Sequence, residues 1–363
     1  MINRRLLAQM EWPLLFITLA VALAGLANIY SSTFVQEIDI YNRQLQWLAV
    51  GLVFMAAAIA FDYTLLDRYG YFIYFLALGL LVWALVFGRT VAGTQRWISL
   101  GFVTFQPSEF TKLAVIVILA RHFAARPARP GGLALRDLVF PALLIAVPFF
   151  LVAAQPDLGT ALIFVLIFCS VVLVVKVRLK TAAGLLLAFA PLVPIAWGSL
   201  KGYQKARLLS FLDPSSDPLG SGYHLLQSKI AIGSGGFWGK GFTKGTQGKL
   251  MFLPEHHTDF IFSILAEEWG LAGSLTVMAL FLSLILYGLH VARSSKDRFG
   301  FLLALGLSSL FFWHIVINLG MVSGLMPVVG VPLPFFSYGG SFLVTAFIGA
   351  GLLINIKMRR FIF

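Results

Sequence analysis

Two carboxylates and two imidazoles occur within five residues of one short segment, Leu253–Phe262. They belong to Glu255, His256, His257 and Asp259. Such groups can move protons in catalysis or hold a metal ion. Adjacent histidines point apart, however, and a spaced ligand set is missing, so a structural zinc site is not expected. The segment joins a long polar stretch to a strongly apolar one, and it is the first place to look for chemistry.

The rest of the chain has the composition of a membrane protein. Of its 363 residues, 59% are hydrophobic and only 12% are charged, whereas a soluble domain has about 25% charged residues. We therefore expect one all-α polytopic membrane domain over 1–363, and the single Cys169 excludes a disulfide framework. The apolar runs predict ten spans, at about 13–33, 44–61, 68–88, 107–123, 138–155, 158–175, 181–199, 268–291, 299–320 and 337–356.

The basic residues indicate the orientation of these spans. Successive connections between spans lie on alternate sides of the membrane. With ten spans, sixteen of the 27 Lys and Arg residues then lie on the side of both termini, and the short loops on the opposite side contain only Arg43, Arg89 and Arg96. The positive-inside rule then puts both termini in the cytoplasm. The net charge of +12 follows largely from this topology, so a nucleic-acid partner is not implied.

The segment 200–259, between spans seven and eight, falls outside the cytoplasm and is too long to be a mere connector. Within it, His224–Ile232 is expected to form a short amphipathic helix. The glycine-dense stretches Gly233–Gly241 and Gly245–Gly248 would expose amides that can cradle an anion. Neither stretch fits a nucleotide-binding pattern. A second outer connection, Arg89–Pro107, alternates polar with apolar residues, which suits an interfacial segment in which Trp97 is either a membrane anchor or a substrate contact.

Glu109 and Lys112 occur near the start of the fourth expected span. Spacing of i and i+3 puts them on one helix face, where they can neutralise each other. The alternatives are a pair that merely tolerates burial and a pair that lines an outer-facing cavity. Pro107 fits the first helical position.

Three further connections are polar or irregular. Gln155–Thr160 is expected to form a tight outer hairpin in which Asp157 caps the following helix. Glu267 and Glu268 are expected at an exposed helix entry. The charge-free segment Met321–Phe336 suggests either a re-entrant segment or a docking face.

Several of these segments together resemble the SEDS family (shape, elongation, division and sporulation), and most closely its RodA branch. The resemblance covers essentially the whole chain, and Phe342 stands where a small residue is expected. The segments that carry it are Gln106–Lys112, Gln155–Ala161, Ile230–Gly236, Gly245–Gln247, Phe252–Phe262 and Pro327–Ser341, with Val328-Val329 typical of the RodA branch.

The resemblance implies a peptidoglycan glycosyltransferase that polymerises lipid II at the outer face of the cytoplasmic (inner) membrane. It also implies a class B penicillin-binding protein as partner, within the rod elongation machinery. The essential carboxylate of the family corresponds to Asp259, its ion pair to Glu109 and Lys112, and its important loop tryptophan to Trp97.

This activity suggests roles for the candidate residues. Asp259 would act as general base on the attacking sugar hydroxyl, and Lys112, with Arg96 as a weaker candidate, would face the departing polyprenyl pyrophosphate. Glu255 would tune the pKa of Asp259 or help to hold a divalent cation such as Mg or Mn. Asp157 and Ser341 are further cavity candidates. The alternatives are a lipid II flippase and a non-catalytic scaffold that binds the penicillin-binding protein through the charge-free loop.

Overall fold

A computed structural model describes most of the chain, namely residues 10–33, 38–91, 94–101, 103–126, 132–178, 181, 198, 202–213, 217, 220–247 and 257–360. Most of the expected span at 181–199 lies outside these residues, as do Glu255 and His256.

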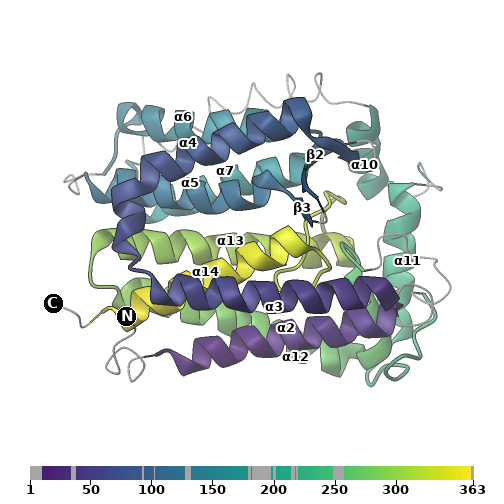
Figure 1. Ribbon diagram of the computed structural model, residues 1–363. Helices are drawn as coiled ribbons and strands as arrows, with labels where there is room; N and C mark the ends of the chain where they lie inside the picture. The colour runs from purple at the N-terminus through teal and green to yellow at the C-terminus, as the bar shows by residue number, and fades with distance from the viewer. Residues whose placement is uncertain are drawn as a thin grey trace.

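Long helices lie side by side in a bundle, with two shorter ones, α10 and α11, at one end (Figure 1). Within the described part of the chain, seven helices are long and apolar enough to cross a membrane, namely α2, α3, α4, α6, α12, α13 and α14. The prediction of a mostly helical polytopic membrane protein is thus confirmed, whereas the number of ten spans stays a prediction. The helices are α2 Trp12–Thr33, α3 Ile38–Ala60, α4 Thr64–Phe87, α5 Pro107–Ala124, α6 Leu135–Ala154, α7 Leu158–Val174, α10 Gly202–Leu212, α11 Ser221–Ser234, α12 Ile261–Ser294, α13 Arg298–Ser323 and α14 Gly340–Met358.

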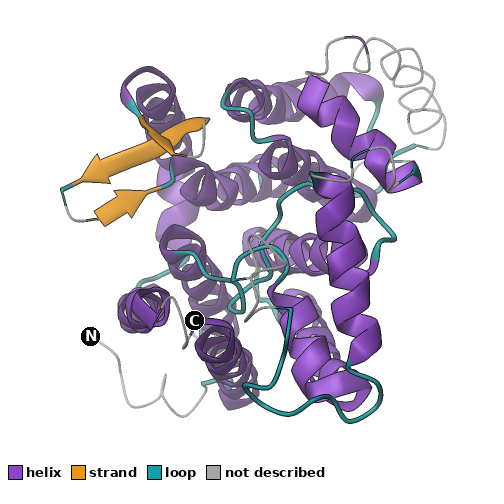
Figure 2. Ribbon diagram, turned by 90° about the vertical axis from the view of Figure 1, so that its right-hand side faces the viewer, coloured by secondary structure: helices purple, strands orange, loops and turns teal. Residues whose placement is uncertain are grey.

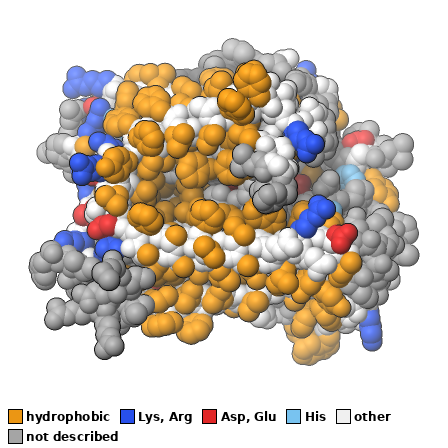
Figure 3. Space-filling view, in the orientation of Figure 1, with side chains coloured by type: hydrophobic (Ala, Val, Ile, Leu, Met, Phe, Trp, Pro, Cys, Tyr) orange, Lys and Arg blue, Asp and Glu red, His pale blue; other side chains and the backbone are white. Residues whose placement is uncertain are grey.

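Helix α5 lies in the interior of the bundle. It packs against α4, α6, α7, α13 and α14, and fifteen of its 18 residues are buried. The peripheral helices instead expose large apolar side chains, such as Phe72 on α4 and Phe150 on α6. On the face that Figure 3 shows, apolar side chains form a band over the middle of the bundle, and basic residues gather at the end that carries the termini. A bilayer solvates such a band, and polar groups are confined to the ends and the interior.

A three-stranded antiparallel sheet lies between α4 and α5, and it corrects the expectation of a purely helical fold (Figure 2). Its strands are β1 Arg89–Val91, β2 Thr94–Leu100 and β3 Val103–Phe105, in the order β1-β2-β3. The alternation of polar and apolar residues over 89–107 is the period-two pattern of a strand. Pairing of the strands gives backbone N–H and C=O groups of this segment hydrogen-bond partners, which an unpaired interfacial chain would have to find in water.

Helix α11 confirms the short helix expected at 224–232. Helix α12 differs from expectation, because it begins at Ile261 instead of near residue 268. Glu267 and Glu268 therefore lie in its first turns, and they are 0% and 3% exposed. The expectation of an exposed helix entry is wrong, because residues 240–247 fold over the two glutamates and bind their carboxylates.

Gly270 interrupts α12 two residues after Glu268, with φ 64° and ψ −159°. Only glycine adopts this conformation without strain. A Cβ atom here would also lie 2.4 Å from the backbone nitrogen of Gly239 and 2.6 Å from the carbonyl oxygen of Phe237. The kink thus lets the α11–α12 connection pack directly on the helix backbone.

Replacing Gly270 with alanine is expected to lower the free energy of unfolding by more than about 2 kcal/mol, because it adds backbone strain and a steric clash. Thermal unfolding of the purified protein in detergent measures this. Gly79→Ala is the matched control, since no atom lies within 4 Å of a Cβ atom built at Gly79. Equal unfolding midpoints for the two variants would contradict the assignment.

Candidate functional site

The first two turns of α5 carry the expected ion pair into the protein interior. Pro107 occupies the start of the helix, as the sequence predicted. One helical turn apart, Lys112 Nζ lies 2.8 Å from Glu109 Oε2, and both side chains are almost completely buried. The prediction that the two charges neutralise each other is confirmed.

His314 of α13 is the second partner of the Lys112 ammonium group. Its Nε2 atom lies 3.1 Å from Lys112 Nζ, and its Nδ1 atom lies 3.0 Å from the carbonyl oxygen of Pro332. Because a carbonyl only accepts, Nδ1 carries the proton and Nε2 accepts from the ammonium group. The Phe342 ring covers the pair, with its centroid 5.2 Å from Lys112 Nζ.

These contacts surround the charge of Lys112. A carboxylate, an imidazole nitrogen and an aromatic face lie around an ammonium group that is 0% exposed. Burying two charges is costly unless partners of this kind replace water. Lys112 is thus a member of an interior cluster, and protein groups enclose its ammonium group.

A second ion pair joins β2 to the start of α7. Arg96 Nη1 lies 2.8 Å from Asp157 Oδ2, and the Arg96 side chain is 29% exposed. Asp157 Oδ1 accepts from the backbone N–H of Thr160 at 3.1 Å, which confirms the expected helix cap. The turn between α6 and α7 likewise confirms the expected hairpin. The Nε atom of Arg96 is buried and has no hydrogen-bond partner among the described residues.

The two ion pairs belong to one site. Gln106, the residue before α5, donates from Nε2 to Asp157 Oδ2 at 3.4 Å and from its backbone N–H to the Ser341 hydroxyl at 3.0 Å. Asp157 and Arg96 also lie close enough to Glu109 for their charges to interact with it. The structure therefore brings together five of the residues expected from the sequence: Arg96, Glu109, Lys112, Asp157 and Ser341.

Trp97 occupies a different position. It follows Arg96 directly on β2, and side chains alternate between the two faces of a strand. Since Arg96 points to Asp157, the Trp97 side chain lies on the other face of the strand and is partly exposed. The choice between membrane anchor and substrate contact therefore stays open.

The segment that carries Asp259 is fixed through three consecutive backbone carbonyls. The donors come from α13 and from the α13–α14 connection, and their distances lie between 2.7 and 3.0 Å. Asp259 itself is half-buried. The bonds run from Tyr338 N to His257 O, from Ser337 Oγ to Thr258 O and from Asn318 Nδ2 to Asp259 O.

The α13–α14 connection lies inside the bundle, as expected of a re-entrant segment. Val331, Leu333 and Phe336 are at most 1% exposed, so the alternative of a surface docking face is wrong for residues 331–337. Gly330 has φ 70°, and a Cβ atom there would lie 3.3 Å from Asp259 Oδ2. The glycine therefore allows the connection to approach the Asp259 carboxylate closely.

Sequence reasoning missed His314 and Asn318. Asn318 Nδ2 donates to the carbonyl oxygens of Val331 and Asp259, at 2.8 and 3.0 Å. The two residues are separated by four positions and lie on one face of α13. Their signal was present, because polar residues inside an apolar span usually face a functional interior.

The glycine-rich loop binds an anion, but the anion belongs to the chain itself. Backbone N–H groups of Thr246 and Gln247 donate to the Glu267 carboxylate, and that of Gly245 to Glu268. Lys240 Nζ lies 2.6 Å from Glu267 Oε1. These amides fasten the loop to α12.

The described residues do not fit a metal site of their own. No group of three or more His, Cys, Asp or Glu side chains within them is placed to hold an ion. Glu255, the expected helper of Asp259 in holding a cation, lies outside the described residues.

Comparison with known proteins identifies the family. The FtsW/RodA/SpoVE family of cell cycle proteins matches residues 12–361. The chain belongs to this family. It is 42% identical to the peptidoglycan glycosyltransferase MrdB of Escherichia coli K12, over 97% of this chain and 94% of MrdB. It is 33% identical to the peptidoglycan glycosyltransferase RodA of Treponema pallidum, over 97% and 98% of the two chains.

Two solved structures share the fold over nearly the whole chain. One is from work on the structural coordination of polymerization and crosslinking by a peptidoglycan synthase complex. It matches with a TM-score of 0.84 and 33% identity, over 98% of this chain and 99% of that one. The other, the rod shape determining protein RodA of Thermus thermophilus, matches with a TM-score of 0.72 and 29% identity, over 97% and 98%.

Removing one partner of the buried ion pair should cost more stability than removing both. Glu109→Gln or Lys112→Met alone leaves an unpaired charge in the interior and is expected to lower the free energy of unfolding by about 3–5 kcal/mol. The double variant should recover most of this loss. A double-mutant cycle on thermal unfolding measures the coupling, and additive losses would contradict the pairing.

Proposed function

We propose that this membrane protein polymerises lipid II into glycan strands at the outer face of the cytoplasmic membrane, with Asp259 as general base. The class of activity is shown by relatives named peptidoglycan glycosyltransferase that match along almost the entire chain. The chain is thus a glycosyltransferase of peptidoglycan synthesis and cell shape. The role of Asp259 rests on its partial exposure, its fixed backbone and its place in the resembling segment.

The reaction needs one proton acceptor and one leaving group. A sugar hydroxyl oxygen attacks the anomeric carbon of a second lipid-linked sugar while its proton passes to the Asp259 carboxylate. The bond between the anomeric carbon and the pyrophosphate oxygen breaks, and polyprenyl pyrophosphate leaves. A single displacement of this kind inverts the anomeric centre and requires one carboxylate, whereas a retaining route would require a second as nucleophile.

We assign the cation that meets the leaving pyrophosphate to Arg96 and not to Lys112. Lys112 is enclosed by Glu109, His314 and Phe342. Arg96 is partly exposed, and its buried Nε–H lacks a hydrogen-bond partner among the described residues. A guanidinium group can bind a phosphate oxygen through several N–H donors while it keeps its contact with Asp157. Assistance by a divalent cation such as Mg or Mn stays a prediction, because Glu255, its expected ligand, lies outside the described residues.

The setting of the site supports the same function. The basic end of the bundle carries both described ends of the chain, joined by a salt bridge of 3.3 Å between Lys357 and Glu11. We place this end in the cytoplasm by the positive-inside rule, with ten spans in total. The sheet, Asp259 and the long loop then lie at the outer face. A class B penicillin-binding protein would crosslink the product there, within the rod elongation machinery.

Asp259→Asn should abolish polymer formation, because an amide cannot accept the proton of the attacking hydroxyl. We expect at least about a 100-fold loss of glycan product, measured as ladders formed from labelled lipid II by the purified protein. The unfolding midpoint should stay that of the unaltered protein.

Undiminished ladders from the Asp259→Asn variant would refute its assignment as base. Transfer of labelled lipid II across liposome membranes without any polymer would favour the flippase alternative instead. Binding of the penicillin-binding protein without either activity would favour the scaffold.

Arg96→Gln is expected to lower the rate of polymerisation by about 10²-fold, the usual effect of removing one donor that stabilises a developing negative charge. Arg89→Gln is the matched control, since Arg89 lies exposed on the neighbouring strand, opposite Trp97 in the register. Equal rates for the two variants in the ladder assay would contradict the role of Arg96.

A further inference from the structure

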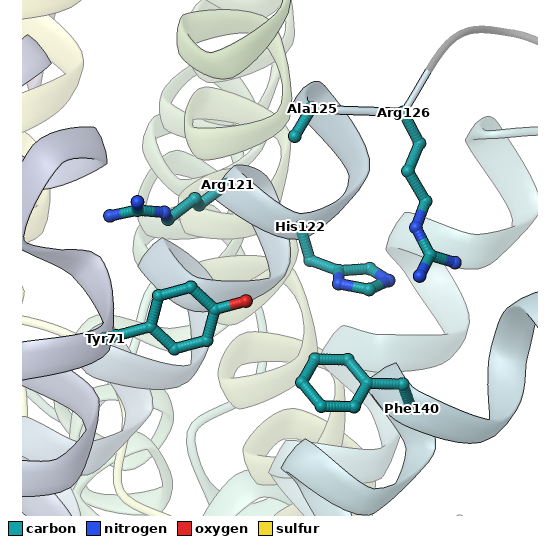
Figure 4. Close-up of a pocket in the computed structure, with 6 residues that line it drawn as sticks. All are labelled: Tyr71, Arg121, His122, Ala125, Arg126 and Phe140. Carbon is teal, nitrogen blue, oxygen red and sulfur yellow. The ribbon is translucent and has the colours of Figure 1, made fainter.

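At the end of the bundle that carries the termini, where α5 ends (Figure 1), residues of α4, α5 and α6 and of the segment after α5 line a pocket (Figure 4). Its volume is about 430 Å³, which is large enough for a phosphate-bearing headgroup. None of its lining residues takes part in the reaction described above. They are Tyr71, Arg121, His122, Ala125, Arg126 and Phe140.

The pocket is positively charged. Arg121 donates from Nη1 to the carbonyl oxygens of Asp67 and Arg68, and its guanidinium group lies over the Tyr71 ring, 4.9 Å from the centroid. Arg126 Nη1 donates to the carbonyl oxygen of Asp137 at 3.3 Å. A guanidinium group has five N–H donors, so these carbonyl contacts hold both groups in place and leave donors for an anion. The lining residues include no acidic side chain.

A second observation that points to a ligand in the pocket is the buried imidazole of His122. Its side chain is 7% exposed, and its Nε2 atom is buried without a hydrogen-bond partner among the described residues. The imidazole ring lies between Arg126 and Phe140, and the Tyr71 hydroxyl points toward it across the pocket (Figure 4). A buried polar atom without a partner is costly, and a ligand oxygen in the pocket would supply that partner.

The surroundings indicate that the anion belongs to a lipid. The outer faces of α4 and α6 next to the pocket expose large apolar side chains, among them Phe72, Phe75, Val139 and Leu143. These helices form part of the apolar band that meets the bilayer (Figure 3). Acyl chains could lie along them while the headgroup phosphate enters the basic pocket, which is how basic pockets between membrane helices bind anionic lipids.

We propose that the pocket binds the phosphate of an anionic phospholipid in the leaflet at this end of the bundle, the cytoplasmic leaflet in the orientation given above. Arg126 and Arg121 contact the phosphate oxygens, and His122 and Tyr71 complete the polar contacts. The site is independent of glycosyl transfer, so its test does not depend on Asp259.

The test uses the full-length protein in an uncharged detergent. The thermal unfolding midpoint is followed as phosphatidylglycerol, phosphatidylcholine with the same acyl chains, or inorganic phosphate is added, since a ligand that binds the native state raises this midpoint. Phosphatidylglycerol should raise it at lower concentration than phosphatidylcholine. Arg126→Gln should weaken the apparent affinity for phosphatidylglycerol about five- to tenfold.

Arg136→Gln is the matched control, because Arg136 is exposed at the same end of the bundle and does not line the pocket. It should keep the preference for phosphatidylglycerol. His122→Phe keeps both arginines and should also weaken binding, which covers the case that Arg126→Gln unfolds. Equal responses to the two lipids, equal responses of the Arg126 and Arg136 variants, or the full effect with inorganic phosphate alone would overturn the proposal.

Discussion

The burial of Glu109 and Lys112 in the middle of the bundle is the constraint on which the rest of the site depends. Two charges can remain in an interior of low dielectric only if protein groups replace the water around them. His314 and Phe342 supply that surrounding for the ammonium group. The Nδ1–H group of His314 in turn donates to the carbonyl oxygen of Pro332 in the α13–α14 connection. The electrostatic requirement of α5 thereby determines how α13 and the following segment pack.

The same face of α13 also contacts the segment that carries Asp259, the proposed base. One turn beyond His314, Asn318 binds both the α13–α14 connection and the backbone of Asp259. The proposed base and the buried ion pair are thus held by one helix, although neither touches the other directly. Rigid elements of this kind keep a reacting group in place better than a loop alone does. This explains why a largely apolar helix carries two polar residues at this spacing.

The two ends of the bundle use polar groups for different purposes. At the end with the sheet, the carboxylates of Glu267 and Glu268 hold the glycine-rich loop against α12 through backbone N–H groups. Amides that could have bound a substrate phosphate therefore serve the fold. At the opposite end, the pocket around Arg126 keeps cationic donors and a buried imidazole nitrogen next to the lipid-facing surface. The proposed base and the proposed lipid site therefore belong to opposite ends of the bundle.

The sequence by itself determined the features that depend on neighbours along the chain. Apolar runs predicted the membrane helices, i and i+3 spacing predicted the pair of Glu109 and Lys112, and Asp157 before a helix predicted its cap. Only the tertiary structure decided that Lys112 meets His314, 202 positions away, that Glu267 is buried, and that Arg96 pairs with Asp157 while it stays partly exposed. Burial and pairing between distant segments depend on how whole helices pack, and the local pattern of residue types carries little information about that packing.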